Sequence, residues 1–280
     1  MQILSTIPEL RRWSRSQRAG GKIIGLVPTM GALHEGHASL IRAARKECGA
    51  VAFSIFVNPT QFGPNEDFAR YPRTFDADCK LAEAEGADVI FAPSVEDLYP
   101  AGTATFVEVE GLSNRLDGAS RPGHFRGVAT VVSKLFIAAE PDRAYFGQKD
   151  AAQVAVLRRM TTDLRLGTDI VVCPIIRDPD GLALSSRNIY LSAEERKQAL
   201  TLSRAIRRVE ALFTNGVHDT AALLSAAHEV FAAEPAVRID YIELVNWSTL
   251  LPVDFAESGS LFAVAAYVGA TRLIDNTILR

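Results

Sequence analysis

Residues 22–37, KIIGLVPTMGALHEGH, join a short apolar run to a glycine-bearing turn and then to two histidines three residues apart. The apolar run is typical of a buried parallel strand, and the residues from Gly36 onward have the spacing of a helix. A strand that turns directly into a helix is the repeating unit of open α/β sheets. The turn and the helix start are therefore expected at the carboxyl edge of a sheet, where such sheets bind ligands.

The same alternation runs through the first two thirds of the chain. Predicted strands are the apolar runs at 22–27, 50–57, 88–93, 105–110, 143–148 and 169–175. Predicted helices between them cover 36–49, 74–86, 125–140 and 150–164. This order predicts the α/β class, with a doubly wound parallel sheet.

The alternation stops near Ile176, at the loop RDPDGLALSSRN. Ser192 and Glu195 then form a capping-box pattern that opens a helix expected to end at Asn215-Gly216. A second helix is predicted over 219–234, followed by strands at 238–247, 260–269 and 271–279. We therefore predict two domains, 1–175 and a smaller α+β domain at 176–280.

The composition excludes several classes of function and partner. The 280-residue chain is 48% hydrophobic, with a formal net charge of -3 and a pI near 6.0, so no global basic field favours nucleic acid. Three distant cysteines outside any CxxC spacing argue against a disulfide framework or thiolate zinc site, and fit a reducing cytoplasm. No apolar run approaches a membrane span. Small-molecule partners are expected, without nucleic acid or membrane.

The histidine stretch suits a phosphate site. A helix N-terminus presents unpaired N–H groups and a partial positive charge, and His34 and His37 add donors there. Gly31 and Gly36 allow the backbone to approach a nucleotide. Neither a P-loop nor a GxGxxG pattern is present. Taken alone, a histidine pair at a helix start is more often a cap.

Two further stretches follow predicted strands on the same edge. In FVNPTQFGPNEDFARYPRT, residues 56–74, Asn58 and Gln61 offer neutral amides to a polar substrate, although a structural loop would use the same residues. In YFGQKDAAQ, residues 145–153, Lys149 suits a phosphate, and Gln153 faces the same way one turn later. Asp150 suits either a helix cap or a ribose hydroxyl.

A third stretch, DGLALSSRN at 180–188, lies at the predicted domain junction. Ser185, Ser186 and Arg187 supply two hydroxyls and a guanidinium fork, a combination suited to phosphate oxygens. A polar hinge is the alternative.

Together these stretches resemble the pantoate–β-alanine ligase family, which makes pantothenate for coenzyme A. The match runs over VPTMGALHEGH, FVNPTQF, YPRT, RPGHFRGVATVVSKLF, YFGQKDAAQ and DGLALSSRN in the family's order, within residues 22–190. The resemblance implies the Rossmann-like fold of the HxGH nucleotidyltransferase superfamily. It also implies condensation of pantoate and β-alanine with ATP, through a pantoyl adenylate, releasing pyrophosphate and AMP.

The resemblance also assigns residues. Catalytic roles fall on His34, His37, Lys149, Ser185, Ser186 and Arg187. The implied ATP site comprises Met30, Gly31, Ala32, Leu33, His34, Glu35, Gly36, His37, Gly147, Gln148, Lys149, Asp150, Ile176, Leu184, Ser185, Ser186 and Arg187. Pantoate contacts fall on Gln61 and Gln153, and Asn58 is a further substrate-binding candidate. The family assigns His37 as a proton donor, and we expect a hydrogen-bond donor to phosphates.

Further expectations concern the metal ion, the RPGHFRG segment, the subunit assembly and the C-terminal part. Mg²⁺ would bridge the ATP phosphates, with no protein ligand assigned. Asp78 suits either an outer metal contact or an exposed position on the helix 74–86. Arg121, His124 and Arg126 border either the phosphates or a subunit contact. The family implies a homodimer, for which residues 105–110 are a candidate edge strand, and residues 176–280 are expected to form a lid over ATP.

Two departures from the family pattern are Leu184 in place of Met and Asp178 in place of Glu. The first conserves side-chain volume and neither removes a phosphate donor. Rival functions are a nucleotidyltransferase acting on a phosphorylated substrate and a regulator that binds ATP without consuming it. A transfer RNA-charging enzyme would need an RNA-binding surface that the sequence does not offer.

Overall fold

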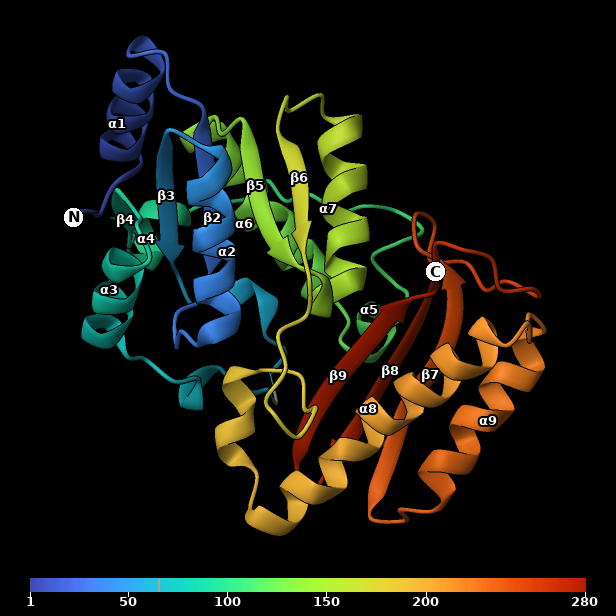
Figure 1. Cartoon of the computed structure of the whole chain (residues 1–280). Coiled ribbons are helices and arrows are strands. Elements are labelled where there is room, and N and C mark those ends of the chain that lie inside the picture. Colours follow the sequence, from blue (N-terminus) through green and yellow to red (C-terminus); the bar gives the residue numbers. More distant parts are fainter. Residues whose placement is uncertain (65) are drawn as a thin grey trace.

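The computed structural model describes residues 1–64 and 66–280 of the chain. Asn65, inside the predicted substrate loop, lies outside the described residues. Two sheets organise the fold, a parallel one in the first part of the chain and an antiparallel one in the last part (Figure 1).

The elements follow one another in this order. In the first part they are β1 Gln2–Leu4, α1 Ile7–Ala19, β2 Ile24–Thr29, α2 Glu35–Glu47, β3 Ala50–Ile55, η1 Pro59–Gln61, η2 Asp67–Arg70, α3 Phe75–Ala84, β4 Val89–Phe91, α4 Val95–Leu98, α5 Asp117–Ser120, α6 His124–Ala139, β5 Arg143–Gly147, η3 Gln148–Asp150, α7 Ala151–Asp163 and β6 Asp169–Cys173. In the last part they are η4 Ser186–Tyr190, α8 Ala193–Thr214, α9 Thr220–Ala232, β7 Val237–Asn246, β8 Ser260–Val268 and β9 Thr271–Ile278.

The larger sheet has six parallel strands in the order β1-β4-β3-β2-β5-β6. The chain builds outward from β2 through β3 to β4 and later crosses back to place β5 on the other side of β2. The topological switch point therefore lies between β2 and β5, where a doubly wound sheet opens a crevice at its carboxyl edge. This confirms the predicted fold class.

Alternating side chains of the strands bury both faces of this sheet. Leu26, Ala52 and Phe146 pack under α1, α6 and α7. Val27, Phe53 and Tyr145 pack under α2 and α3. Because both faces of the sheet are covered, its strands are nearly continuous apolar runs. Such runs could be predicted as strands from the sequence.

The smaller sheet is an antiparallel meander in the order β7-β8-β9. On β8, Phe262 and Val264 face the core formed with α8 and α9. The alternate residues Leu261 and Ala263 belong to the core of the larger sheet's helices. One strand thus joins the two halves, since successive side chains point to opposite faces.

One expected strand is absent, and two elements were not predicted. Residues 105–110 form no strand, because Val107 N–H donates to Thr130 Oγ1 at 2.9 Å and Val109 N–H to Ser113 Oγ at 3.2 Å instead of to a neighbouring strand. The edge strand β1 and the helix α1 were not predicted. The strand β1 has only three residues, and α1 buries only Leu10 and Ser14.

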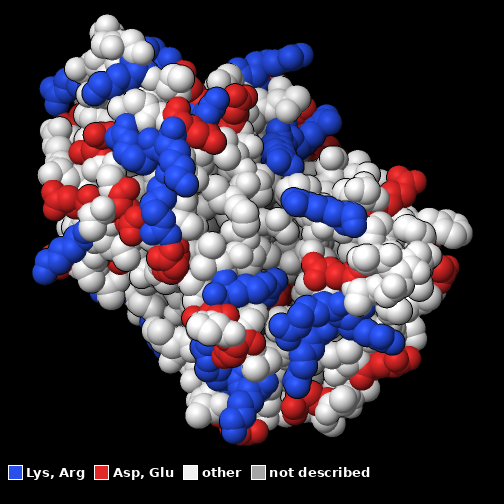
Figure 2. Space-filling model, in the orientation of Figure 1, with Lys and Arg blue, Asp and Glu red and all other residues white. Residues whose placement is uncertain are grey.

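Acidic and basic side chains intermingle over the face of the molecule drawn in Figure 2, in keeping with the small net charge. Among the described residues, none of the helices combines the length and apolar character needed to cross a bilayer.

Candidate active site

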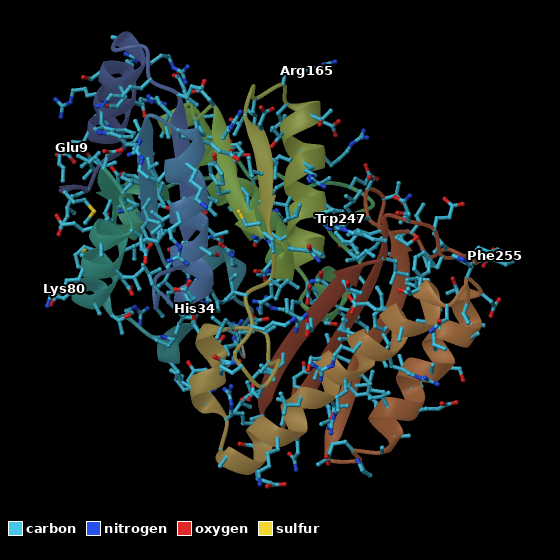
Figure 3. All side chains as sticks on the ribbon, in the orientation of Figure 1. Glu9, His34, Lys80, Arg165, Trp247 and Phe255 are labelled. Atoms are coloured by element: carbon cyan, nitrogen blue, oxygen red, sulfur yellow. The ribbon has the colours of Figure 1, made fainter. Side chains whose placement is uncertain are left out.

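The two histidines lie at the start of α2, which follows β2 in the chain. His34 is labelled in Figure 3. His34 is the N-cap of the helix, and its Nδ1 accepts the Gly36 N–H at 3.1 Å. His37 Nδ1 in turn accepts the His34 N–H at 3.3 Å, and the ring centroids are 4.2 Å apart. Because each Nδ1 accepts a hydrogen bond from a backbone N–H, each neutral ring carries its proton on Nε2 and is a donor there.

Burial and positive charge keep both rings neutral. Burial lowers the pKa of His34 to about 4, with Lys149 as the next cause. Burial lowers the pKa of His37 to about 3, assisted by His34 and Lys149. The capping arrangement that alone would suggest a structural role thus also prepares two uncharged donors.

The donors border a cavity of about 240 Å³, which we call the central cavity. It lies at the β2–β5 switch point, between the first sheet and the loop that follows β6. The predicted residues that line it are Met30, His34, Gly36, His37, Gln61, Gly147, Lys149, Asp150, Gln153, Ile176, Leu184, Ser185, Ser186 and Arg187. Segments from 30 to 187 thus converge on one site, as the sequence predicts.

Six candidate residues are not on the wall of this cavity: Gly31, Ala32, Leu33, Glu35, Asn58 and Gln148. Glu35 is exposed and forms an ion pair with Arg42. Gln148 donates from Nε2 to Asn276 Oδ1 at 3.3 Å, so its side chain faces β9 rather than the cavity. The geometry therefore does not favour direct contact between these six residues and a ligand in the central cavity.

Asn58 holds Gln61 instead of reaching the cavity. It is fully buried, and its Nδ2 donates to Gln61 Oε1 at 2.9 Å and to the Gly127 carbonyl at 3.1 Å. Among the described residues, no acceptor is bonded to the Gln61 Nε2 group, so its hydrogens remain available to a ligand. Asn58 therefore fixes the side chain of Gln61, which lines the central cavity, and does not line that cavity itself.

Residues 180–188, which we call the serine loop, form part of the wall of the central cavity, opposite the histidines. Ser185 is the N-cap of η4 and accepts the Arg187 N–H at 3.3 Å. Ser186 Oγ donates to the Ala32 carbonyl at 3.1 Å, which ties this loop to the turn before His34.

Arg187 is engaged by a carboxylate. Its Nε and Nη2 each donate to Asp67 at 2.9 Å, a two-pronged pair of the kind guanidinium groups also form with phosphates. Although burial acts to raise the pKa of Asp67, these bonds hold it below its usual range. Asp67 thus occupies the fork of Arg187.

In the RPGHFRG segment, Arg121 and His124 line the central cavity, whereas Arg126 lies on the surface. Arg121 donates to both carboxylate oxygens of Glu66 at 2.7 and 2.6 Å, and His124 Nδ1 lies 2.8 Å from the Gln61 carbonyl. Both line the central cavity and an adjoining junction cavity of about 640 Å³ that extends to β9. Arg126 is exposed, with its guanidinium carbon 3.8 Å from the Phe106 ring centroid.

Asp78 is not the exposed helix residue that the sequence suggested. It is 2% exposed, and its two carboxylate oxygens accept the N–H groups of Ala32 and Leu33, each at 2.9 Å. These partners lie on a turn far earlier in the chain, so no local pattern announces the contact.

An apolar wall was also missed by sequence reasoning. Val128, Val131, Val132 and Leu135 of α6 line the cavity, with Phe146 beside them. Their i, i+3, i+4, i+7 spacing predicts a buried helix face but does not distinguish a core from a cavity wall. Tyr71, in the YPRT segment, also lines the cavity and is 7% exposed.

The described residues contain no group of three or more His, Cys, Asp or Glu side chains arranged to hold a metal ion.

Comparisons with known proteins point to one family. The family profile described as Pantoate-beta-alanine ligase matches residues 2–278. A pantothenate synthetase of Acidobacterium capsulatum is 65% identical over 260 residues, covering 93% of this chain and 87% of that protein. One from Thermotoga neapolitana is 55% identical over 279 residues and 100% of both chains.

Solved structures agree over nearly the whole chain. Pantothenate synthetase from Thermus thermophilus has a TM-score of 0.93 at 46% identity, covering 99% of each chain. The pantoate-beta-alanine ligase from Francisella tularensis, solved with Beta-gamma ATP and Beta-alanine, has a TM-score of 0.81 at 35% identity, covering 99% of this chain and 97% of that one. The resemblance inferred from six short motifs is thereby confirmed, and this chain belongs to the pantoate–β-alanine ligase family.

Proposed function

We propose that this chain condenses pantoate with β-alanine, using ATP, to give pantothenate, AMP and pyrophosphate through a pantoyl adenylate. Family membership supports the reaction class. The single observation that carries the assignment is the pair of neutral imidazole donors beside Lys149 on the wall of a cavity that also contains two glutamines.

The phosphate end of the site suits attack of a carboxylate on the α-phosphorus. Negative charge builds on the phosphate oxygens as the carboxylate adds and pyrophosphate leaves. His34, His37 and Lys149 place donors there, and Ser185 and Arg187 approach from the serine loop. Because Nδ1 of each neutral ring accepts a backbone N–H, the remaining ring proton lies on Nε2, and each ring can donate one hydrogen bond to a phosphate oxygen.

The opposite end suits pantoate. Gln61 and Gln153 offer amides to its carboxylate and hydroxyls, and the α6 face, including Val128 and Val131, accepts its methyl groups. A neutral amide orients the attacking carboxylate without the shift in its pKa that a nearby charged group would cause. β-Alanine would enter beside Gln61, where its amine attacks the acyl carbon and AMP leaves.

Mg²⁺ fits as a companion of ATP rather than as a resident ion. The described residues offer no three-ligand group for it, and Mg²⁺ commonly keeps most of its ligands from water and phosphates. Asp150 lines both cavities and is the candidate for an outer contact. When bound, the ion would neutralise phosphate charge.

We further infer a two-domain division at 1–175 and 176–280, with the second part closing over ATP. Its β9 borders the junction cavity through Thr271, Arg272 and Leu273. The segment 176–190, which includes η4, connects β6 to α8 (Figure 1), and it contributes Ile176, Leu184, Ser185, Ser186 and Arg187 to the wall of the central cavity. A homodimer is proposed from the family resemblance, and a reducing cytoplasm from three cysteines that form no disulfide, two of them buried.

The test separates the two half-reactions. Purified protein with ATP, Mg²⁺ and pantoate should release about one pyrophosphate per site, and sustained turnover with AMP should require β-alanine. A dinucleotide-like product would favour a nucleotidyltransferase, and ATP binding without consumption would favour a regulator. No pantoate-dependent pyrophosphate would refute the proposed substrate.

A further inference from the structure

We propose that Asp78 is a positioning residue for adenylate formation. Its carboxylate holds the turn that fixes the position of His34 on one side of the phosphate site and of Ser186 on the other. The proposal rests on the proposed function for its chemistry. Asp78 touches neither substrate in this account and acts only through the backbone of Ala32 and Leu33.

The contacts of Asp78 are specific and shielded. Its Oδ2 accepts Ala32 N–H at 2.9 Å, and its Oδ1 accepts Leu33 N–H at 2.9 Å and Thr74 Oγ1–H at 3.0 Å. The residue sits in the first turn of α3 at 2% exposure. It lines another cavity, of about 330 Å³, with Gly31 and Thr74, and does not line the central cavity.

The turn needs such a partner. Gly31 and Ala32 both have left-handed backbone conformations, with φ of 83° and 52°. Glycine adopts this region freely, but an alanine there costs about 1–2 kcal/mol. Ala32 and Leu33 also precede the N-cap, so α2 gives their N–H groups no acceptor. One carboxylate compensates for both deficits by binding the two N–H groups.

The same turn links the two halves of the phosphate site. The Ala32 carbonyl accepts Ser186 Oγ–H at 3.1 Å, so the serine loop is anchored to the peptide that Asp78 holds. Leu33 leads directly into His34, whose ring contacts His37. A turn that shifts by a fraction of an ångström therefore moves donors on both sides of the α-phosphorus, and such misplacement is costly in catalysis.

Direct metal binding by Asp78 agrees less well with its contacts than the positioning role does. Both carboxylate oxygens already accept hydrogen bonds from three donors. Asp78 also lines a different cavity from His34, and its carboxylate is bonded to the backbone of Ala32 and Leu33 and to Thr74.

The test compares Asp78→Asn with a matched control at the opposite end of β2. Asparagine keeps the shape but offers one acceptor oxygen and an NH₂ group that faces a backbone N–H. We expect the single-turnover rate of pantoate-dependent pyrophosphate release to fall at least about 30-fold, with the KM for pantoate within about 2-fold. Amide hydrogen exchange at Ala32 and Leu33 should accelerate at least about 10-fold.

The control is Asp142→Asn. Asp142 accepts the Ile24 N–H at 2.7 Å at the start of β2 and pairs with Arg18. This substitution should lower the melting temperature while leaving the pyrophosphate rate and the exchange at Ala32 unchanged. Rate losses in the two variants that both track melting temperature would overturn the proposal, because they would reflect general destabilisation.

A second variant covers the case in which Asp78→Asn does not fold. Thr74→Val removes one donor to Asp78 and should lower the rate about 3-fold with faster exchange at Leu33. Wild-type rate and exchange in a folded Asp78→Asn, or in Thr74→Val when that variant must serve, would overturn the proposal. A wild-type protein inactive with pantoate would instead refute the proposed function, and the exchange measurement would still decide whether Asp78 holds the turn.

Discussion

At the residue scale, the histidine pair shows how one hydrogen-bond pattern serves folding and chemistry together. Capping by Nδ1 fixes the ring of His34 against the helix start and leaves Nε2–H directed away from it. The same logic applies to His37, which caps the N–H of His34. A capping serine would satisfy the helix equally well but would not supply a ring donor beyond it.

The lowered histidine pKa values predict a loss of stability in mild acid. Burial sets the pKa of His34 at about 4 and of His37 at about 3, and burial, followed by Arg121, sets the pKa of His124 at about 4. The unfolded chain binds more protons between these values and about 6.5, so stability falls as pH drops through that window. Melting temperature should therefore decline between about pH 6.5 and about pH 4.5.

The contribution of one ring can be isolated. His124→Gln should flatten this decline, because it removes one group that must stay uncharged in the folded state. Unfolding is followed by circular dichroism at each pH, and imidazole ¹⁵N shifts should report neutral rings at about pH 5.5. A charged His37 signal in the folded protein at that pH would contradict the assignment.

Asn58 offers a test of indirect substrate recognition. Asn58→Ala removes the donor to Gln61 Oε1 and leaves the Gly127 carbonyl without this partner. We expect about 1–3 kcal/mol loss in unfolding free energy and a raised KM for pantoate, with the KM for ATP nearly unchanged. Gln61→Ala should raise the KM for pantoate similarly, and combining both should add little more, because they remove one shared contact.

Additive effects of the two substitutions on pantoate KM would show that Asn58 contributes independently of Gln61. Denaturant titration of both single variants provides the stability comparison.

At the element scale, the contact between α6 and η1 places the substrate loop. A Cβ at Gly127 would lie 2.2 Å from the Thr60 carbonyl oxygen and 2.8 Å from Gln61 N, both backbone atoms that cannot rotate aside. The helix can approach the loop this closely only because the side chain is a hydrogen. Glycine here is a packing requirement and not a turn signal.

Gly127→Ala should therefore destabilise the fold and displace Gln61 together. We expect at least about 2 kcal/mol loss in unfolding free energy and a raised KM for pantoate. Gly147→Ala is the stability control, because an added methyl there meets no atom within 4 Å. If Gly127→Ala unfolds like the control, the close approach of α6 and η1 does not exist in solution.

The elements that sequence predicted well are those with strong internal patterns. The strands β2, β3 and β5 are buried on both faces, and α8 opens with the predicted capping box at Ser192. Residues 105–110 were predicted as a strand from their apolar run, whereas side-chain oxygens of Thr130 and Ser113 accept the N–H groups of Val107 and Val109. An apolar run does not show whether a neighbouring strand or a side chain accepts those N–H groups.

The site followed the same division. Its motifs lie at strand ends, where topology alone brings them to one edge, so the cavity wall could be predicted in outline. The contacts of Asn58 and Asp78 could not be predicted from the sequence, because each side chain bonds to backbone groups remote in sequence. Residue type suggested a polar contact in both cases, and only the fold decides what is contacted.

At the scale of the whole molecule, the two sheets share packing that limits how a lid could move. Val245, Leu261 and Ala263 of the smaller sheet belong to the core that includes Phe125 of α6. Trp247 Nε1 donates to the Ala151 carbonyl at 3.0 Å, at the place where the second sheet meets α7 (Figure 3). Within the second part, closure over ATP is therefore expected from the segment 176–190, while the sheet β7-β8-β9 keeps its place in this shared core.

A shared core predicts one cooperative unfolding transition, and Arg272 tests it. Its Nη1 donates to Asp117 Oδ1 at 2.7 Å and its Nη2 to Asp240 Oδ2 at 2.8 Å, joining β9 to α5 and to β7. All three side chains are at least four-fifths buried. Arg272→Met would leave two carboxylates without their cation, which costs about 3–5 kcal/mol for buried pairs.

The matched control is Arg159→Met, because the Arg159–Asp163 pair is roughly half exposed and pairs of that kind contribute less than about 1 kcal/mol. Denaturant unfolding, followed by both fluorescence and far-ultraviolet circular dichroism, should give Arg272→Met a single transition at a clearly lower midpoint, while the control stays near wild type. Two separated transitions in Arg272→Met would show that the junction depends on this ion pair more than on the shared apolar core. A midpoint equal to the control would show that water screens Asp117 and Asp240, and the second sheet would then be free to move farther than its packing suggests.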